Sequence, residues 1–147
     1  MSIDKNDGMV VGVEKSLRHI EAIIKQKGRE ILGDYAITPP QFIALQWLFE
    51  LGDMTIGDLS NRIFLACSTT TDLVDRMEKN KLVVRVKDPK DRRVVRIHLL
   101  PEGERVIEEV IKKRQHYLEG VLGNFSENEI AFLQSTLKKL HDEMKEK

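Results

Sequence analysis

The side chains best suited to chemistry in this sequence are short hydroxyls and cations in the middle of the chain. Ser68, Thr69 and Thr71 are compact donors and acceptors that can approach the base edges of DNA, where a threonine methyl group can also meet thymine. Capping a helix and keeping its surface soluble is the alternative role for them. The nearby cations are suited to neutralise phosphates, which positions a duplex without reading its sequence: Lys79, Lys81, Lys87, Lys90 and Arg92.

The net charge of zero conceals a separation of charge along the chain. Between Arg62 and Arg96 the sequence has 10 Lys/Arg and 5 Asp/Glu residues, whereas the remainder has 14 Lys/Arg and 19 Asp/Glu residues. One part of the molecule therefore carries a positive field, as a phosphate-binding surface requires. A charged hairpin that is merely solvated is the alternative explanation.

Other kinds of chemistry find no support in the sequence. It has no glycine-rich phosphate loop, nucleophile elbow or His-Glu-x-x-His run, and the adjacent carboxylates Glu108 and Glu109 lie on a polar helix face. The 4 histidines are scattered, and no two of them have metal-ligand spacing. We therefore expect no enzyme activity, no metal and no cofactor.

Cys67 is the only cysteine, which excludes an internal disulfide and suits a reducing cytoplasm. Met1 is followed by polar residues rather than by an apolar signal segment, and no run of about 18 apolar residues occurs. We expect a cytoplasmic protein with no membrane partner. Because a helix N-terminus can lower the pKa of a thiol, Cys67 could act as a redox switch, although a lone cysteine more often fills a core.

The elements that must position these side chains include a hairpin. Residues 82–99, LVVRVKDPKDRRVVRIHL, place two alternating apolar runs around a turn that contains proline. Alternation with a period of two predicts a half-buried β-hairpin with a basic tip. Leu82, Val84 and Val86 share one face of the outgoing strand, and Val83 and Arg85 share the other.

Two short helices precede the hairpin. The first is expected over 56–62 with Thr55 as its N-cap, and the second is expected to run from its cap at Ser68 to Lys79. Asn80 is expected to take the left-handed conformation that ends the second helix. Two short helices joined by a tight turn predict a helix-turn-helix, and the hairpin after them makes it a winged helix.

Long amphipathic helices bracket this compact middle. One is expected over 9–32 and two follow Pro101, the last of them opened by a capping box of Ser126 and Glu129. Their apolar stripes exceed what the middle can cover, so we predict a symmetric homodimer. The expected fold is mainly α with a small β-hairpin wing: an N-terminal dimerisation helix (1–35), a winged helix-turn-helix DNA-binding domain (36–100) and C-terminal dimerisation helices (101–147).

Several of these segments together resemble the MarR/SlyA family of bacterial transcriptional regulators. The resemblance is carried by STTTDLVDRMEKN at 68–80, DPKDRR at 88–93, LLPEGE at 99–104 and ITPPQF at 37–42. Each motif is modest alone, but their order and spacing are specific. The order and length of the expected helices fit the same family over nearly the whole chain.

The resemblance implies a homodimer that binds pseudo-palindromic double-stranded DNA operators, usually as a repressor, and releases them when a small ligand or an oxidant changes the spacing of its two reading heads. The residues implied to read the major groove are Ser68, Thr69, Thr71 and Asp72, with Arg76 near the DNA backbone. Arg93 matches an arginine that enters the narrow, strongly negative minor groove. Asp91 matches an acidic residue that holds the wing in shape, together with Arg85.

The family also implies an effector pocket between the dimer helices and the reading head. His19, Phe42 and Trp47 are candidates to line it, because aromatic and mixed polar groups suit a small phenolic or other organic effector. Ordinary core packing is the alternative role for them. At the level of function, the alternative is a dimeric helical module whose winged helix contacts protein rather than DNA. Repression or activation, the operator and the effector are left open.

Overall fold

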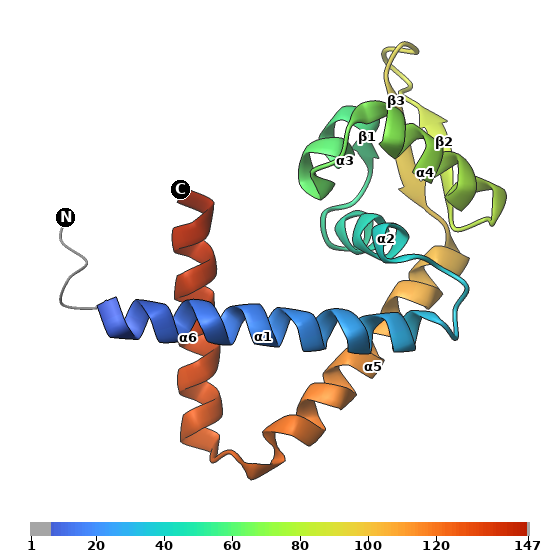
Figure 1. Ribbon diagram of the computed structural model, residues 1–147. Coiled ribbons are helices and arrows are strands. Elements are labelled where there is room, and N and C mark those ends of the chain that lie inside the picture. Colours follow the sequence, from blue (N-terminus) through green and yellow to red (C-terminus); the bar gives the residue numbers. More distant parts are fainter. Residues whose placement is uncertain (1–6, 147) are drawn as a thin grey trace. The chain divides into compact units, whose positions relative to one another are not determined.

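The computed structural model describes residues 7–146, and the chain divides between Ile111 and Lys112 into two compact units. In order, the first unit contains α1 (Asp7–Leu32), α2 (Pro39–Leu51), β1 (Met54–Thr55), α3 (Ile56–Ile63), α4 (Cys67–Lys79), β2 (Val83–Lys87), β3 (Val95–Leu99) and the first part of α5 (Pro101–Val121) (Figure 1). The second unit contains the rest of α5, the short 3-10 helix η2 (Leu122–Asn124) and α6 (Glu127–Glu146). The mainly helical fold with a hairpin wing is confirmed.

The core of the first unit lies where α2, α3, α4 and the sheet meet. Its fully buried side chains include Ala44, Leu45, Leu59, Val74, Met77, Val83 and Ile97. Caps determine where the helices begin: Thr38 and Gln41 form a reciprocal capping box at α2. The predicted N-cap of α3 is confirmed, because the Thr55 hydroxyl accepts the backbone N–H of Asp58 at 3.1 Å.

The hairpin of β2 and β3 forms over the predicted residues, and its pairing decides which face is buried. The antiparallel register places Val83 opposite Leu99 and Arg85 opposite Ile97, so these residues share one face. Val83 and Ile97 are fully buried there, whereas Val86 on the other face is 44% exposed. The alternation of apolar residues in β2 therefore does not by itself identify the inner face, which carries Arg85.

A third strand completes the sheet and was not expected from the sequence. The two residues of β1, Met54 and Thr55, pair with Ile97 and Arg96, which gives the order β1-β3-β2. The run is too short to show alternation, so no sequence pattern indicates it. Its pairing anchors β3 on the side away from β2.

Gly103 allows α5 to approach the base of the hairpin closely. A Cβ atom at this position would lie 2.2 Å from the carbonyl oxygen of Leu82 and 2.7 Å from Cδ1 of Leu99. The helix then buries Val106, Ile107 and Val110 in the first unit. Farther along, the Tyr35 hydroxyl donates to Oε1 of Glu109 at 3.3 Å, which joins the loop after α1 to α5.

The long helices leave most of their apolar side chains uncovered. In α1 only the last turn, with Ile31 and Leu32, is buried. In the second unit the exposed apolar side chains include Leu118, Val121, Phe132, Leu137 and Met144. The capping box at α6 is confirmed, since Ser126 and Glu129 each accept the other's backbone N–H, at 3.1 Å and 2.9 Å. Within residues 7–146 no helix is long and apolar enough to cross a membrane.

Candidate nucleic-acid interface

Helix α4 separates a buried apolar face from an exposed polar one. Thr70, Val74 and Met77 are buried, and their spacing of four and three residues keeps them on one side of the helix. The predicted reading residues Ser68, Thr69 and Asp72 are exposed, as are Asp75, Arg76 and Lys79 farther along the helix. Thr71 is half-buried, and its hydroxyl donates to the carbonyl of Cys67 at 2.9 Å.

The start of α4 differs from the prediction that Ser68 caps it. Ala66 is the N-cap and offers no side-chain hydrogen bond. Its carbonyl already accepts the backbone N–H of Thr70 at 2.9 Å, so helical bonding begins before Ser68. The Ser68 side chain therefore does not serve as the cap. Cys67, the first residue of the helix, is exposed, so the core-filling alternative for this cysteine is wrong.

The end of α4 also differs from the prediction by one residue. Asn80 has φ −86° and ψ 6°, and Lys81 instead takes the left-handed conformation with φ 63°. The reason is the bond from the Leu82 N–H to the carbonyl of Met77 at 2.9 Å, which requires the left-handed residue just before Leu82. The buried Leu82 side chain anchors this turn.

A salt-bridge cluster joins α4 to the first strand of the wing. The Arg85 guanidinium donates to Oε1 of Glu78 at 2.7 Å and to Oδ1 of Asp75 at 2.6 Å. The backbone N–H of Arg85 also donates to Oε2 of Glu78 at 3.0 Å. Burial of Arg85 opposes its charge, but the two carboxylates outweigh that effect and raise the pKa of the guanidinium. The predicted pairing of Arg85 with Asp91 is wrong, because Arg85 faces α4 rather than the wing tip.

The wing tip, residues 88–94, is organised around Asp88. Oδ1 of Asp88 accepts the backbone N–H groups of Lys90 and Asp91 at 2.8 and 3.2 Å, and Oδ2 accepts from the Arg96 guanidinium. The backbone N–H of Asp88 donates to the carbonyl of Val94 at 2.9 Å, which closes the loop. A carboxylate that bonds the backbone two and three residues on is a common means of shaping a turn.

Asp91 holds Arg93 instead of Arg85. Oδ1 of Asp91 accepts both the backbone N–H and the Nε–H of Arg93, each at 3.1 Å. The Arg93 side chain remains 91% exposed. Arg93, the predicted minor-groove residue, is therefore presented to solvent, and Asp91 helps to shape the wing tip that carries it.

Both wing carboxylates are held in the ionised form. The pKa of Asp88 is lowered, first by the backbone N–H of Lys90 and then by the Arg96 guanidinium. The pKa of Asp91 is lowered by the hydrogen bonds from Arg93. The contacts that shape the wing tip thus require negative carboxylates.

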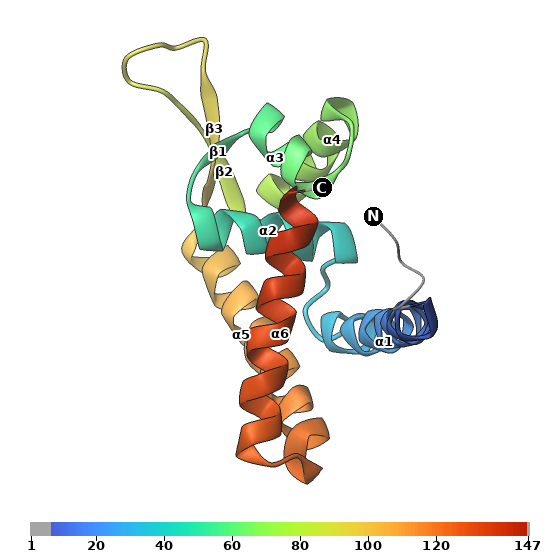
Figure 2. The same ribbon diagram turned by 90° about the vertical axis from the view of Figure 1, so that its left-hand side faces the viewer.

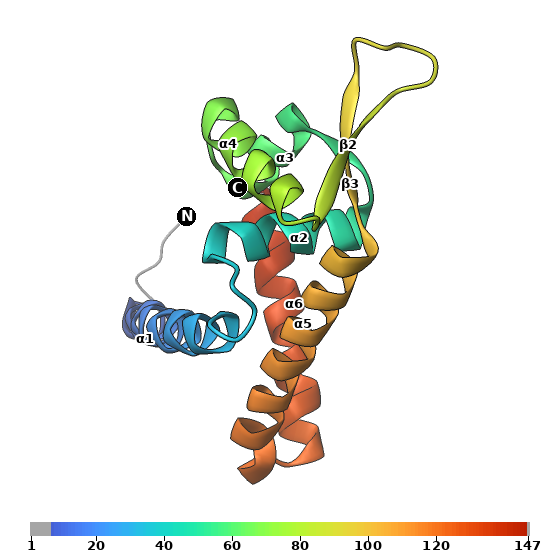
Figure 3. The same ribbon diagram turned by 90° about the vertical axis from the view of Figure 1, so that its right-hand side faces the viewer.

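Two groups of exposed cations in the first unit lie on α4 and on the wing. Arg76 and Lys79 are exposed on the helix. Those exposed on the wing are Lys87, Lys90, Arg92 and Arg93. Figures 2 and 3 show the wing and α4 at the same end of this unit, with the wing tip projecting beyond its strands. The structure therefore brings together the hydroxyl and cationic side chains that the sequence singled out.

Comparison with known proteins identifies this arrangement. Residues 37–95 match the family model described as MarR family. The chain is 70% identical over 138 residues to the HTH-type transcriptional regulator YsmB of Bacillus subtilis (strain 168), which covers 94% of each chain. The chain belongs to the MarR family. The predicted resemblance is thereby confirmed.

Solved structures agree with this assignment. A MarR family protein from Bacillus stearothermophilus is 61% identical and superposes with a TM-score of 0.90 over 95% of this chain and 98% of its own. NadR, solved in complex with 4-hydroxyphenylacetate, is 26% identical and superposes with a TM-score of 0.70 over 87% of this chain and 91% of its own. The winged helix fold is thus that of MarR family regulators.

The three predicted effector residues of this MarR family chain lie on two helices. Phe42 and Trp47 are half-buried on α2 and pack against the core, whereas His19 is exposed on α1. The Arg62 guanidinium lies 5.2 Å from the centre of the Trp47 ring, so part of the Trp47 surface already has a partner. A hollow beside α3 is lined by other residues: Leu51, Met54, Asp58, Asn61 and Arg62.

Among the residues that the structure describes, no group of three or more His, Cys, Asp or Glu side chains could hold a metal ion. The residues that sequence reasoning missed are structural: Asp88 at the wing tip, Arg96 on β3 and Glu78 on α4. Asp88 could have been found from its position, since an aspartate directly before Pro89 is a common turn residue. The partners of Glu78 and Arg96 depend on how the strands pair, which spacing alone does not reveal.

Proposed function

We propose that this chain is a homodimeric repressor that binds a pseudo-palindromic DNA operator and is released by a small organic effector. The observation that carries the proposal is the exposed edge of α4, with Ser68, Thr69 and Asp72, in the same unit as a wing that presents Arg93 to solvent. Hydroxyls and a short carboxylate suit base edges in the major groove, and an exposed arginine suits the minor groove. Thr71, with its hydroxyl proton bonded to the backbone, contributes its oxygen and methyl group.

The cations have a different role from these reading residues. Arg76, Lys79, Lys87, Lys90 and Arg92 neutralise phosphates and set the position of the duplex. Asp91 contributes indirectly, since it shapes the wing tip and holds Arg93. Binding to chromosomal DNA places the protein in the cytoplasm.

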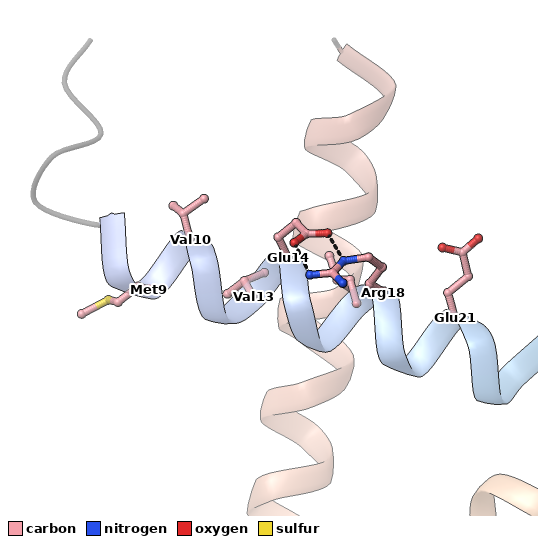
Figure 4. Close-up of a pocket in the computed structure, with 7 residues that line it drawn as sticks. Met9, Val10, Val13, Glu14, Arg18 and Glu21 are labelled. Carbon is pink, nitrogen blue, oxygen red and sulfur yellow. Dashed lines mark hydrogen bonds and ion pairs between the residues drawn. The ribbon is translucent and has the colours of Figure 1, made fainter.

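Dimerisation through the segments 1–35 and 101–147 is supported by the apolar side chains that these segments leave uncovered. Along α1, Met9, Val10 and Val13 are 71%, 47% and 53% exposed. They line a hollow along α1, together with the Glu14–Arg18 ion pair (Figure 4). Exposed apolar stripes of this size are stabilised by burial against a partner.

Release by an effector, and repression rather than activation, are proposed from the family. NadR binds 4-hydroxyphenylacetate, a phenolic acid. In this chain His19, Phe42 and Trp47 would contribute to such a pocket when the dimer is assembled. A phenolic ligand suits aromatic and mixed polar side chains.

Selection of bound sites from random duplex DNA tests the proposal. We expect two inverted half-sites about one helical turn apart, since each subunit presents one α4 helix. Affinity is then measured against salt concentration for the unsubstituted protein and for Arg93→Ala. The slope of log K against log salt should become shallower by about one contact in Arg93→Ala. Lys145→Ala, which removes an equal charge at the end of α6, should leave the slope unchanged.

A correctly folded dimer that binds no duplex, or binds with no dependence on salt, would contradict the proposal. It would favour the alternative in which the winged helix contacts protein. A monomer that binds single half-sites would contradict the dimeric part alone.

A further inference from the structure

A short apolar turn, residues 64–67, is exposed between α3 and the first residue of α4. Phe64, Leu65, Ala66 and Cys67 are all exposed, and Phe64 is the most exposed large hydrophobic side chain in the part of the chain that the structure describes, at 91%. The apolar faces of α3 and α4 on either side of this turn are buried. The side chains of this turn are therefore exposed, although the apolar faces of the two helices that flank it are buried.

The backbone of Phe64 is also strained. It has φ 58° and ψ 41°, the left-handed conformation that ends α3. A side chain with a Cβ atom costs about 1–2 kcal/mol there, whereas glycine costs none. The turn itself is made by backbone bonds, since Ser60 O accepts the N–H groups of Phe64 and of Leu65. The ring is not needed to form the turn, and strained, exposed residues of this kind are often functional.

We propose that this apolar turn is part of the DNA interface, with the Phe64 ring packed against apolar surface of the duplex. That surface is supplied by thymine methyl groups or by deoxyribose faces. The inference rests on the proposed function, because it extends the surface with which α4 reads DNA. Continuity supports it: Cys67 directly precedes Ser68 and Thr69, so the turn adjoins the end of α4 that presents the reading residues.

The chemistry of the surroundings favours DNA over a protein partner for this turn. The first exposed side chains after the turn on α4 are the hydroxyls of Ser68 and Thr69. Farther along the helix the carboxylates of Asp72 and Asp75 are exposed, as are two cations, Arg76 and Lys79. An aromatic or aliphatic side chain beside such polar groups matches the major groove, where thymine methyl groups lie among donors and acceptors. Burial of the ring there would also offset the strain of its backbone.

The test compares three variants on the duplex selected by the unsubstituted dimer. Phe64→Gly removes the ring and the strain, Phe64→Tyr keeps the ring, and Leu51→Ala removes another exposed apolar side chain from the same unit. We expect affinity to fall roughly fivefold or more in Phe64→Gly, to stay within about twofold in Phe64→Tyr, and to be unchanged in Leu51→Ala. Thermal unfolding of Phe64→Gly should occur at the same or a higher temperature, which separates binding from folding.

Two further measurements identify the contact. An apolar contact changes affinity without changing the salt slope, unlike Arg93→Ala. Replacing individual thymines by deoxyuracil removes only the methyl group. If one such replacement weakens the unsubstituted protein but not Phe64→Gly, the ring contacts that methyl group; if none does, it contacts deoxyribose.

Unchanged affinity of Phe64→Gly overturns this inference and leaves the proposed function standing. A change in the mass of the dimer in Phe64→Gly, measured by sedimentation, also overturns it, since the ring would then contact another copy of the chain. Failure of the unsubstituted protein to bind any duplex overturns both.

Discussion

Helix α4 and the wing tip supply the two parts of the candidate interface, and they are held in place by different forces. In α4, Thr70, Val74 and Met77 are fully buried, so the helix is oriented by the core of the first unit. In residues 88–94 no side chain is buried, and the loop takes its shape from hydrogen bonds to Asp88 and Asp91. The orientation of α4 therefore depends on packing, and the shape of the wing tip depends on charge.

This difference separates stability from recognition. A change in the core behind α4 alters the free energy of unfolding of the whole unit, because packing there is shared with α3 and the sheet. A change in the wing tip alters only a loop that projects into solvent, so we expect it to affect the proposed DNA binding with little effect on folding. The Arg85–Glu78–Asp75 cluster lies between these extremes, since it joins α4 to the base of the wing.

Gly103→Ala should have the largest effect, because it disturbs the support of both regions at once. Its Cβ would lie 2.2 Å from the carbonyl oxygen of Leu82, the residue that links α4 to β2. Backbone must move to relieve this contact, so we expect a loss of about 3 kcal/mol or more in the free energy of unfolding. Urea denaturation followed by circular dichroism measures it.

Gly120 provides the matched control in the same helix. A Cβ at Gly120 meets nothing within 4 Å, so Gly120→Ala should leave stability unchanged or raise it by up to about 1 kcal/mol. Equal effects of the two substitutions would contradict the close approach of α5 to the hairpin.

Met77→Ala should have the next largest effect on the free energy of unfolding, and this effect concerns the packing of α4 and not the wing tip. Met77 is fully buried on the inner face of α4, and its truncation should cost about 2–4 kcal/mol. Met77→Leu, which nearly conserves volume, should cost less than about 1.5 kcal/mol. Urea denaturation gives both values. A loss of DNA affinity in Met77→Ala at temperatures where it remains folded would show that packing also sets the reading geometry.

How much of the structure the sequence could predict depended on whether a feature is set by local rules or by contacts between elements. Elements fixed by local rules were found: the hairpin by its alternation, α3 by its cap at Thr55, and α6 by its capping box. The exposed edge of α4 followed from the period of its apolar residues. The ends of α4 were misplaced by one or two residues, because Ala66 and Lys81 have no side-chain signal for the positions they occupy.

Contacts between elements were the least predictable part. Asp91 was paired with Arg85, but the partner of Arg85 depends on which face of β2 is buried. The sequence pattern showed which residues share each face but did not decide which face is buried, and the register buries the face that carries Val83 and Ile97. The role of Gly103 likewise depends on how closely α5 approaches Leu82 and Leu99. That close approach exists only in the folded structure, so the sequence does not reveal it.

Glu78→Gln should have an intermediate effect, because it weakens the connection between the two regions. Glu78 accepts from both the side chain and the backbone N–H of Arg85. The uncharged amide cannot accept both bonds as strongly, so we expect a loss of about 1 kcal/mol in the free energy of unfolding. Asp75→Asn is the control, since the Asp75 side chain is 59% exposed and should contribute less. Denaturation at low and high salt should show the Glu78→Gln effect shrinking as salt rises; an effect independent of salt would contradict an electrostatic link.

The smallest effect on stability should come from protonating the wing carboxylates, and it isolates the tip from α4. The pKa of Asp88 is lowered, first by the Lys90 N–H and then by Arg96, so its stabilising bonds are present above the ordinary aspartate pKa of about 4 and are lost as pH falls through the lowered value. Hydrogen exchange of the Lys90 amide should therefore speed up in acid, beyond the intrinsic dependence of exchange on pH. The amide of Val74, within α4, should keep its protection over the same range. Asp88→Asn should remove the acid dependence at Lys90, because its side chain does not titrate. Parallel loss of protection at Lys90 and Val74 would mean that the wing tip and α4 open together, and that charge and packing do not act separately in this unit.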